Sequence, residues 1–329
     1  MYYNGPVSGT GSGDVAYEVG MSKNTPVVIT TKQAKNQINH FGRSLVLYIA
    51  VFMAVNYGVP FIASHYPAVL NGIDVDLLRL CLSIILMIVI TVIPFNISAH
   101  ALDLNISEYL KNPRLRADRV VALICIGIGL NLVVTSISTL FYFFFHTQSI
   151  SYSFLGSFRT TDQIIKNILY LLHFVLIKPV CDEYIFRGII QRQLGHYGRY
   201  FGVLGSAALY AISQPNLVDA VPAFFVGWYL SLITLRYHSI RPSVQVHIAL
   251  CLFLWALDVI PGNYLWLITV FIIVIYILAG LFLFQKRVDT GLVRYGATEW
   301  KLWRILLTSG SIIVCMVLFA INVFLSLRG

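Results

Sequence analysis

The sequence predicts an all-α protein, a polytopic integral membrane helix bundle of about eight or nine transmembrane helices. Hydrophobic residues make up 58% of the 329 residues, charged residues make up 11%, and the mean hydropathy is +0.78. Soluble domains have a lower apolar fraction and a higher charged fraction. The chain also holds many apolar segments close to the roughly 20 residues that a helix needs to cross a bilayer. We therefore expect the protein to be embedded in a lipid bilayer.

The apolar segments follow one another through short polar connections. We expect spans near residues 44–63, 77–95, 120–145, 164–190, 200–214, 218–236, 243–260, 264–285 and 305–327. The segment near 200–214 is shorter than the hydrocarbon core requires, so it is expected to be tilted, buried or re-entrant. The sequence does not decide whether this segment crosses completely.

The basic residues gather on alternate loops, and this asymmetry predicts the orientation. Seventeen of them fall on one side of the expected spans: Lys23, Lys32, Lys35, Arg43, Lys111, Arg114, Arg116, Arg119, Arg192, Arg199, Arg236, Arg241, Lys286, Arg287, Arg294, Lys301 and Arg304. The other side has four, Arg79, Arg159, Lys166 and Arg328, and Lys178 and Arg187 fall within a span, which accounts for all 23. Cytoplasmic loops carry the excess of Lys and Arg. We therefore expect a cytoplasmic N-terminus, an outer C-terminus and a location in the plasma membrane.

Four regions are expected along the chain. Residues 1–42 are rich in Gly, Ser, Thr and Asn and predict a flexible cytoplasmic tail. Residues 43–145 hold the N-terminal transmembrane helices, residues 160–260 carry the polar motifs, and residues 261–329 hold the C-terminal helices. The five cysteines fall in expected spans without a CxxC pair, so no disulfide framework is expected. The net charge of +9 reflects membrane topology, and no nucleic-acid partner is expected.

The first polar motif is Asp182-Glu183-Tyr-Ile-Phe-Arg187-Gly, which lies inside an otherwise apolar segment. Ionisable groups at membrane depth are costly and mark candidate functional sites. Glu183 and Arg187 are four residues apart on one helix face and can pair, whereas Asp182 points about 100° away. Lys178 is four residues before Asp182, so these two side chains can form an ion pair of their own.

Two further motifs follow in the next spans. Tyr210-Ala-Ile-Ser-Gln214 lies near the end of the segment at 200–214, and His247-Ile-Ala-Leu-Cys251 places an imidazole and a thiol one turn apart. The order of the three motifs resembles that of the CPBP family of membrane endopeptidases, which includes CAAX prenyl endopeptidases and bacterial Abi-type proteins. The resemblance covers about residues 160–260 and implies a CPBP-like core that hydrolyses a peptide bond in a membrane-anchored protein or peptide.

The resemblance also implies roles for these residues, and three positions depart from the family pattern. Asp182, Gln214 and Cys251 stand where the family has Glu, His and Asn. Asp keeps the carboxylate but shortens it, and a misplacement of about 1 Å can cost 100-fold in rate. Gln has no titratable proton near neutral pH and cannot act as a general base. The sequence therefore leaves catalytic activity itself undecided.

Structural interpretations remain beside the catalytic ones. Glu183 and Arg187 can be an ion pair that stabilises the bundle, and Asp182 can be locked by Lys178. Gln214 can be a hydrogen-bonding cap, His247 can be solvated near the cytoplasmic interface, and Cys251 can be a packing residue.

No cofactor is expected, although a zinc site remains an alternative. The nominal ligands for zinc would be Asp182, Glu183, His247 and Cys251. This set mixes hard and soft donors, which disfavours a zinc site. A cysteine peptidase built on Cys181 or Cys251 is disfavoured as well, because an apolar bundle raises the pKa of a thiol.

Two functional classes remain. As an enzyme, the protein would use Asp182 and Glu183 to activate or position water, with Arg187 orienting Glu183 and His247 polarising the carbonyl. As a catalytically inactive pseudoprotease, it would act as a membrane scaffold or regulator of a partner such as a cell-envelope enzyme or a peptide exporter. A small-solute transporter would be expected to show paired half-repeats, and the sequence has no such internal symmetry.

Overall fold

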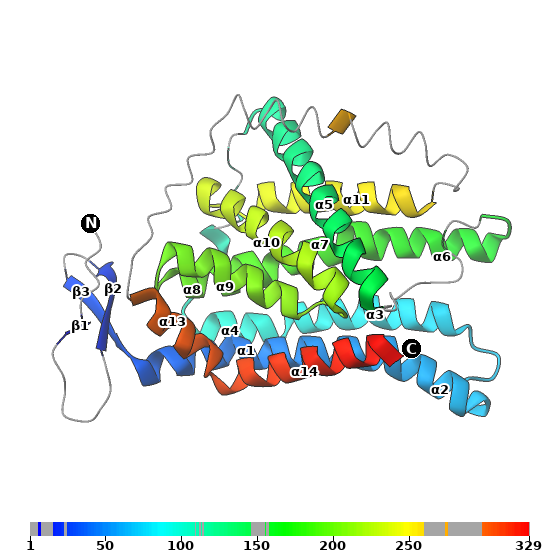
Figure 1. Ribbon diagram of the computed structural model, residues 1–329, viewed down its shortest axis with the longest axis horizontal. Helices are drawn as coiled ribbons and strands as arrows, with labels where there is room; N and C mark the ends of the chain where they lie inside the picture. The colour runs from blue at the N-terminus through cyan, green and yellow to red at the C-terminus, as the bar shows by residue number, and fades with distance from the viewer. Residues whose placement is uncertain are drawn as a thin grey trace.

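The computed structural model describes residues 6–7, 16–22, 25–108, 110–111, 113, 115–145, 155, 158–259, 274–275 and 298–328. Across these residues the protein is an elongated helix bundle, with a small sheet at one end of its long axis (Figure 1). The predicted all-α polytopic bundle is confirmed. The sheet is a minor addition near the N-terminus, formed by β1 (Pro6–Val7), β2 (Ala16–Ser22) and β3 (Thr25–Thr30), all antiparallel in that order.

Six helices within the described residues are long and apolar enough to cross a membrane. They are Thr31–His65, Val75–Ala101, Ala117–Ser136, Thr161–Gly195, Leu217–Tyr237 and Gly310–Leu327. Arg241–Leu257 is a shorter apolar helix. These lengths agree with integration into a membrane. The span expected near 264–285 lies outside the described residues, except for positions 274–275.

The first helix, α1 (Thr31–Met53), begins earlier than the boundary expected at residue 43. A capping box fixes this start: the Gln33 N–H donates to Thr30 Oγ1 at 3.3 Å, and the Thr30 N–H donates to Gln33 Oε1 at 3.0 Å. One face of the first turns of α1 is buried and consists of Ala34, Ile38 and Phe41. Part of the segment expected as a flexible tail therefore belongs to a packed helix.

Two long helical segments contain π-helical turns. The first runs from α1 through η1 (Ala54–Gly58) into α2 (Val59–His65). The second runs through α6 (Thr161–Leu171), η4 (Leu172–Ile177), α7 (Lys178–Asp182), η5 (Glu183–Ile190) and α8 (Gln191–Gly195). Both η1 and η4 end just before a proline, Pro60 and Pro179. A proline cannot donate to the preceding turn and crowds it, which favours a wider turn at that point.

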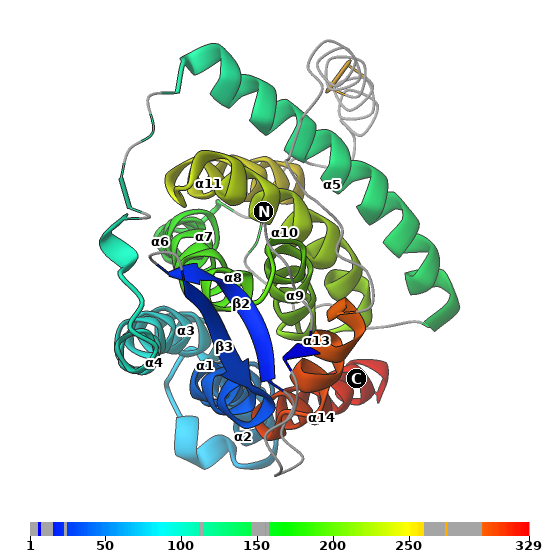
Figure 2. The same ribbon diagram turned by 90° about the vertical axis from the view of Figure 1, so that its left-hand side faces the viewer.

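The remaining helices complete the bundle. They are α3 (Val75–Val92), α4 (Pro94–Ala101), α5 (Ala117–Phe145), α9 (Arg199–Ile212), α10 (Leu217–Tyr237), α11 (Arg241–Val259), α13 (Thr298–Leu307) and α14 (Gly310–Arg328). Short 3₁₀ turns lie at Pro67–Leu70 and Ile106–Glu108. Figure 2 shows α5 crossing obliquely over the outside of α10 and α11.

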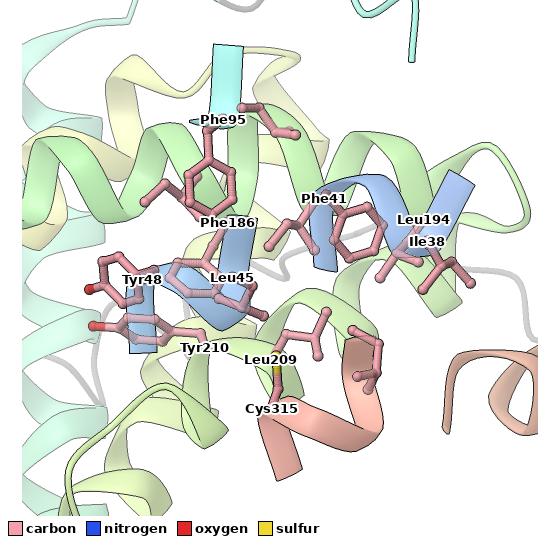
Figure 3. Packing of buried hydrophobic residues seen from close by; sticks show 14 of the residues in the cluster. Ile38, Phe41, Leu45, Tyr48, Phe95, Phe186, Leu194, Leu209, Tyr210 and Cys315 are labelled. Carbon is pink, nitrogen blue, oxygen red and sulfur yellow. The ribbon is translucent and has the colours of Figure 1, made fainter. Parts of the chain in front are cut away.

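Two apolar clusters hold the helices together. The larger one joins α1, α4, η5, α9 and α14 through fully buried side chains that include Phe41, Phe95 and Phe186 (Figure 3). The smaller one joins α5, α10 and α11 and is centred on Leu230 and Val246. The motif-bearing segment η5 contributes Ile185, Phe186, Ile189 and Ile190 to the larger cluster. The polar side chains of the same segment face the other way, toward α10 and α11.

Candidate functional site

Glu183 is at the centre of a buried charged group. Its Oε1 lies 3.1 Å from Arg187 Nη1 and 3.0 Å from His247 Nδ1. Glu183 and Arg187 are completely buried, and His247 is 5% exposed. An ionised carboxylate only accepts hydrogen bonds, so a hydrogen bond between these two atoms requires the imidazole to donate through Nδ1. The helix segment η5 thus meets α11 through one carboxylate oxygen.

The other Glu183 oxygen, Oε2, has a different environment. It is buried and has no hydrogen-bond partner among the described residues. A buried carboxylate oxygen without a partner is expensive in an apolar bundle, and such groups call for a water molecule or a ligand. This oxygen therefore has hydrogen-bonding capacity that the described residues do not use.

Arg187 is fixed on three sides. In addition to Glu183, its Nη2 donates to the Gly227 carbonyl at 2.9 Å, and its guanidinium lies 4.9 Å from the centre of the Tyr210 ring. A Cβ added at Gly227 would lie 3.1 Å from Nη2 and 3.0 Å from the Tyr210 ring. The absence of a side chain at Gly227 therefore lets α10 come close enough to hold the guanidinium.

Asp182 belongs to a separate group on another face of the helix. Lys178 Nζ donates to its Oδ2 at 2.7 Å, and the Tyr48 hydroxyl donates to its Oδ1 at 3.0 Å. Both carboxylate oxygens are thus engaged, and Asp182 is completely buried. The ion pair with Lys178 was expected from the spacing of the two residues. Tyr48, which comes from α1, carries no sequence signal that links it to residue 182.

Gln214 lies at the end of α9 and caps it. Its Nε2 donates to the Tyr210 carbonyl at 3.0 Å and lies 3.5 Å from Ser213 Oγ. These contacts are those of a helix C-terminal cap, in which a side chain satisfies a carbonyl left without an intrahelical donor. No hydrogen bond between Gln214 and the charged group is recorded among the described residues.

Tyr210 takes the place next to the imidazole. Its hydroxyl lies 3.5 Å from His247 Nε2, and the two rings meet edge to face at 6.1 Å. Cys251 follows one turn later on α11, is buried, and interacts with the imidazole. The structure therefore brings Glu183, Arg187, His247 and Cys251 together, adds Tyr210, and holds Asp182 and Gln214 in contacts of their own.

The four side chains considered as zinc ligands do not form a ligand set. Within the part of the chain that the structure describes, no three His, Cys, Asp or Glu side chains are placed to hold a metal ion. The reason is visible in the contacts of Asp182, whose two oxygens turn toward Lys178 and Tyr48 rather than toward His247.

Comparison with known proteins agrees with the motif order. Residues 164–253 match the family model described as type II CAAX prenyl endopeptidase Rce1-like. This match confirms the resemblance inferred from the three motifs, and the matched segment runs from α6 to α11 and contains every residue of the charged group. No curated protein and no solved structure matched the chain.

Proposed function

We propose that this chain, whose residues 164–253 form an Rce1-like segment, is a membrane-embedded endopeptidase that cleaves a membrane-anchored protein or peptide. The observation that carries the proposal is the Glu183 carboxylate, which is held through Oε1 by Arg187 and His247 while Oε2 has no partner among the described residues. A carboxylate fixed on one oxygen is oriented to act through the other. Hydrolysis requires such a positioned base within hydrogen-bond reach of water.

The proposed reaction follows from this arrangement. Glu183 Oε2 accepts a proton from a water molecule as the water oxygen bonds to the carbonyl carbon of the scissile peptide. The developing oxyanion is stabilised by hydrogen bonds from the Tyr210 hydroxyl and from Nε2–H of a doubly protonated His247 imidazole, which face each other. Collapse of the tetrahedral intermediate breaks the C–N bond, and Glu183 passes its proton to the leaving amine.

Asp182 has a supporting role in this proposal. Its oxygens already accept hydrogen bonds from Lys178 and Tyr48, so it joins α7 to α1 and fixes the helix turn that precedes Glu183. The shorter side chain at this position is then a structural lock, which does not need the reach that a water-activating group requires.

The location and orientation belong to the same proposal. The protein would lie in the plasma membrane with its N-terminus in the cytoplasm, since the basic loops lie on that side. The ends of α8 and α10, which carry Arg192 and Arg236, would then face the cytoplasm.

One test needs no guessed substrate. New protein termini would be mapped by mass spectrometry in membranes from cells with the native chain, without it, and with Glu183→Gln. Asp219→Asn, which alters an acid hydrogen-bonded to Asn216 near the start of α10, is the control. Termini that require the native chain and vanish with Glu183→Gln support proteolysis. Identical termini in all strains, with expression confirmed, would exclude it.

A catalytically inactive scaffold is the second candidate. Two observations favour it: Glu183 and Arg187 have no exposed surface, and Gln214 caps α9 where the resembling family has a histidine. The variant Glu183→Gln separates the candidates. A protease would lose its chain-dependent protein termini with this change, whereas a scaffold would keep its phenotype and would lose it when exposed helix faces are changed.

A further inference from the structure

A row of buried polar groups leads away from Glu183 along two helices. On the continuous segment η5–α8 the row continues through Arg187 and Gln191. On α10 it runs through Ser231 and Thr234. Their exposed fractions are between 0% and 7%. Segments in the apolar part of a bundle rarely place so many polar side chains on one seam without a functional reason.

The two helices are joined by a repeated contact. Arg187 Nη2 donates to the Gly227 carbonyl at 2.9 Å, and Gln191 Nε2 donates to the Ser231 carbonyl at 2.8 Å. Both contacts join residues 40 positions apart, so each helix advances by four residues from one contact to the next. The seam between η5–α8 and α10 is therefore a parallel ladder with Glu183 at its inner end.

Several atoms on this seam have hydrogen-bonding capacity that the described residues do not use. They are Glu183 Oε2, Arg187 Nε, Gln191 Oε1 and Ser231 Oγ. A serine in a helix commonly donates to the carbonyl four residues earlier, as Ser83, Ser136 and Ser309 do here at 2.8 Å. Ser231 does not use this local solution although it is completely buried. Four unpartnered polar atoms on one seam are too costly for a dry interior.

The row ends at the basic end of the bundle. Thr234 Oγ1 donates to Ser243 Oγ at 3.0 Å, and Ser243 donates to the Ile240 carbonyl at 2.9 Å, next to the turn between α10 and α11. Gln191 is followed by Arg192, and the turn is followed by Arg241. The polar seam thus links the turn beside Arg241 to Glu183, which lies deep in the bundle.

We infer that this seam binds water and forms a hydrated path from the basic end of the bundle to Glu183. Gln191 and Ser231 are its positioning residues, because each offers an unused side-chain oxygen to a water molecule. The hydrogen bond from Gln191 Nε2 to the Ser231 carbonyl fixes the distance between the two helices. The inference concerns hydration and stands whether or not the site hydrolyses peptide bonds.

Thiol reactivity in the intact membrane protein tests the inference. Ser231→Cys and Leu230→Cys would be introduced into a chain whose five cysteines are replaced by alanine, and inside-out vesicles would be treated with a small charged methanethiosulfonate. Both positions are 0% exposed, but Leu230 lies in the apolar cluster. Since only a hydrated thiol ionises readily, Ser231→Cys is expected to react about ten-fold faster or more. Adding Gln191→Leu is expected to slow Ser231→Cys toward the Leu230→Cys rate.

Equal rates at the two positions would overturn the hydrated path. If Ser231→Cys does not give a monodisperse protein, Thr234→Cys is compared with Ile233→Cys, its neighbour on α10. Thr234 is 1% exposed and lies on the polar row, whereas Ile233 is 3% exposed and lies in the apolar cluster. A faster rate at residue 234 supports the path, and equal rates reject it. Proteolysis is read separately from protein termini, so a hydrated but inactive protein and a dry one give different results.

Discussion

Asp182 and Glu183 are neighbours in the sequence and have different environments. Asp182 is neutralised by Lys178 and held by Tyr48, whereas Glu183 is shared between Arg187 and His247. Successive residues on a helix point about 100° apart, which is how two adjacent acids reach two separate partners. Asp182 therefore has both carboxylate oxygens engaged in structural contacts, whereas Glu183 has one oxygen without a partner among the described residues.

The Arg187 side chain is expected to be the main stabilising group of the charged cluster. Arg187→Met leaves Glu183 buried with one partner fewer and the Gly227 carbonyl without its donor. Removing one member of a buried ion pair costs about 3–5 kcal/mol. The control is Arg116→Met, because Arg116 also pairs with an acid but is 82% exposed; its cost should be about 0.5 kcal/mol or less. Denaturant unfolding in detergent measures both, and equal costs would contradict the assignment.

Lys178 and Asp182 are expected to behave as one unit. Lys178→Met alone leaves a buried carboxylate, and Asp182→Asn alone leaves a cation beside the Tyr210 ring. The double variant removes both charges and should cost clearly less than the sum of the single changes, with a coupling of about 0.5–3 kcal/mol. Unfolding free energies of the three variants and the parent complete the cycle. Additive costs would show that the two side chains do not form a lock.

At the scale of the elements, the site depends on a wide helical turn and a close helix contact. The π-helical segment η5 begins at Glu183 and carries both Glu183 and Arg187, and insertions of this kind are frequent at functional sites. The close contact joins α8 to α9, where a Cβ added at Gly202 would lie 2.8 Å from backbone atoms of Gly195. Together they keep η5 and α8 close to α9 and α10.

The α8–α9 contact gives a matched pair of substitutions. Gly202→Ala would push against the backbone of Gly195, which cannot rotate away, and is expected to destabilise the fold by about 1–3 kcal/mol. Gly195→Ala adds a Cβ that meets nothing within 4 Å and, as a glycine in a helix, should be neutral or stabilising by up to about 1 kcal/mol. Thermal unfolding in detergent compares them. The opposite order would contradict the close packing.

The sequence was most informative where chemistry and periodicity coincide. The spacing of Lys178 and Asp182, and of Glu183 and Arg187, predicted both ion pairs, because residues four apart on a helix share a face. It could not predict the Tyr48 contact or the π-helical turns. Tyr48 reaches Asp182 across 134 residues, and a π-helical turn depends on packing as well as on local propensity. The start of α1 at Thr31 was not predicted, because the expected span was drawn from a continuous apolar segment. The first turns of α1 have only a narrow apolar face, formed by Ala34, Ile38 and Phe41.

At the scale of the whole molecule, the chain direction alternates through the site. The ladder contacts show that η5–α8 and α10 run in parallel, so α9 returns the chain between them. Fourteen residues of α-helix span about 21 Å, less than the roughly 30 Å hydrocarbon core. The helix α9 therefore connects the end of α8 to the start of α10 and is shorter than the hydrocarbon core.

The proposed orientation in the membrane gives a direct prediction. A tag before Thr31 is expected to be protected from protease added to intact cells, and a tag after Arg328 is expected to be cleaved. The reason is the excess of basic residues on the loops that share the N-terminal side. A tag in the loop between α2 and α3, which has no Lys or Arg, serves as a second outer marker. Protection of the C-terminal tag with cleavage of the N-terminal one would invert the topology.

The central claim is that Glu183, and not Asp182, is the reactive carboxylate. It is tested most directly by mapping membrane protein termini in two strains, one with Glu183→Gln and one with Lys178→Met and Asp182→Asn together, at matched levels of folded protein. The account predicts that chain-dependent termini vanish in the first strain and persist in the second, because the paired change removes the lock without leaving a buried charge. Termini that persist with Glu183→Gln and vanish with the paired change would contradict it.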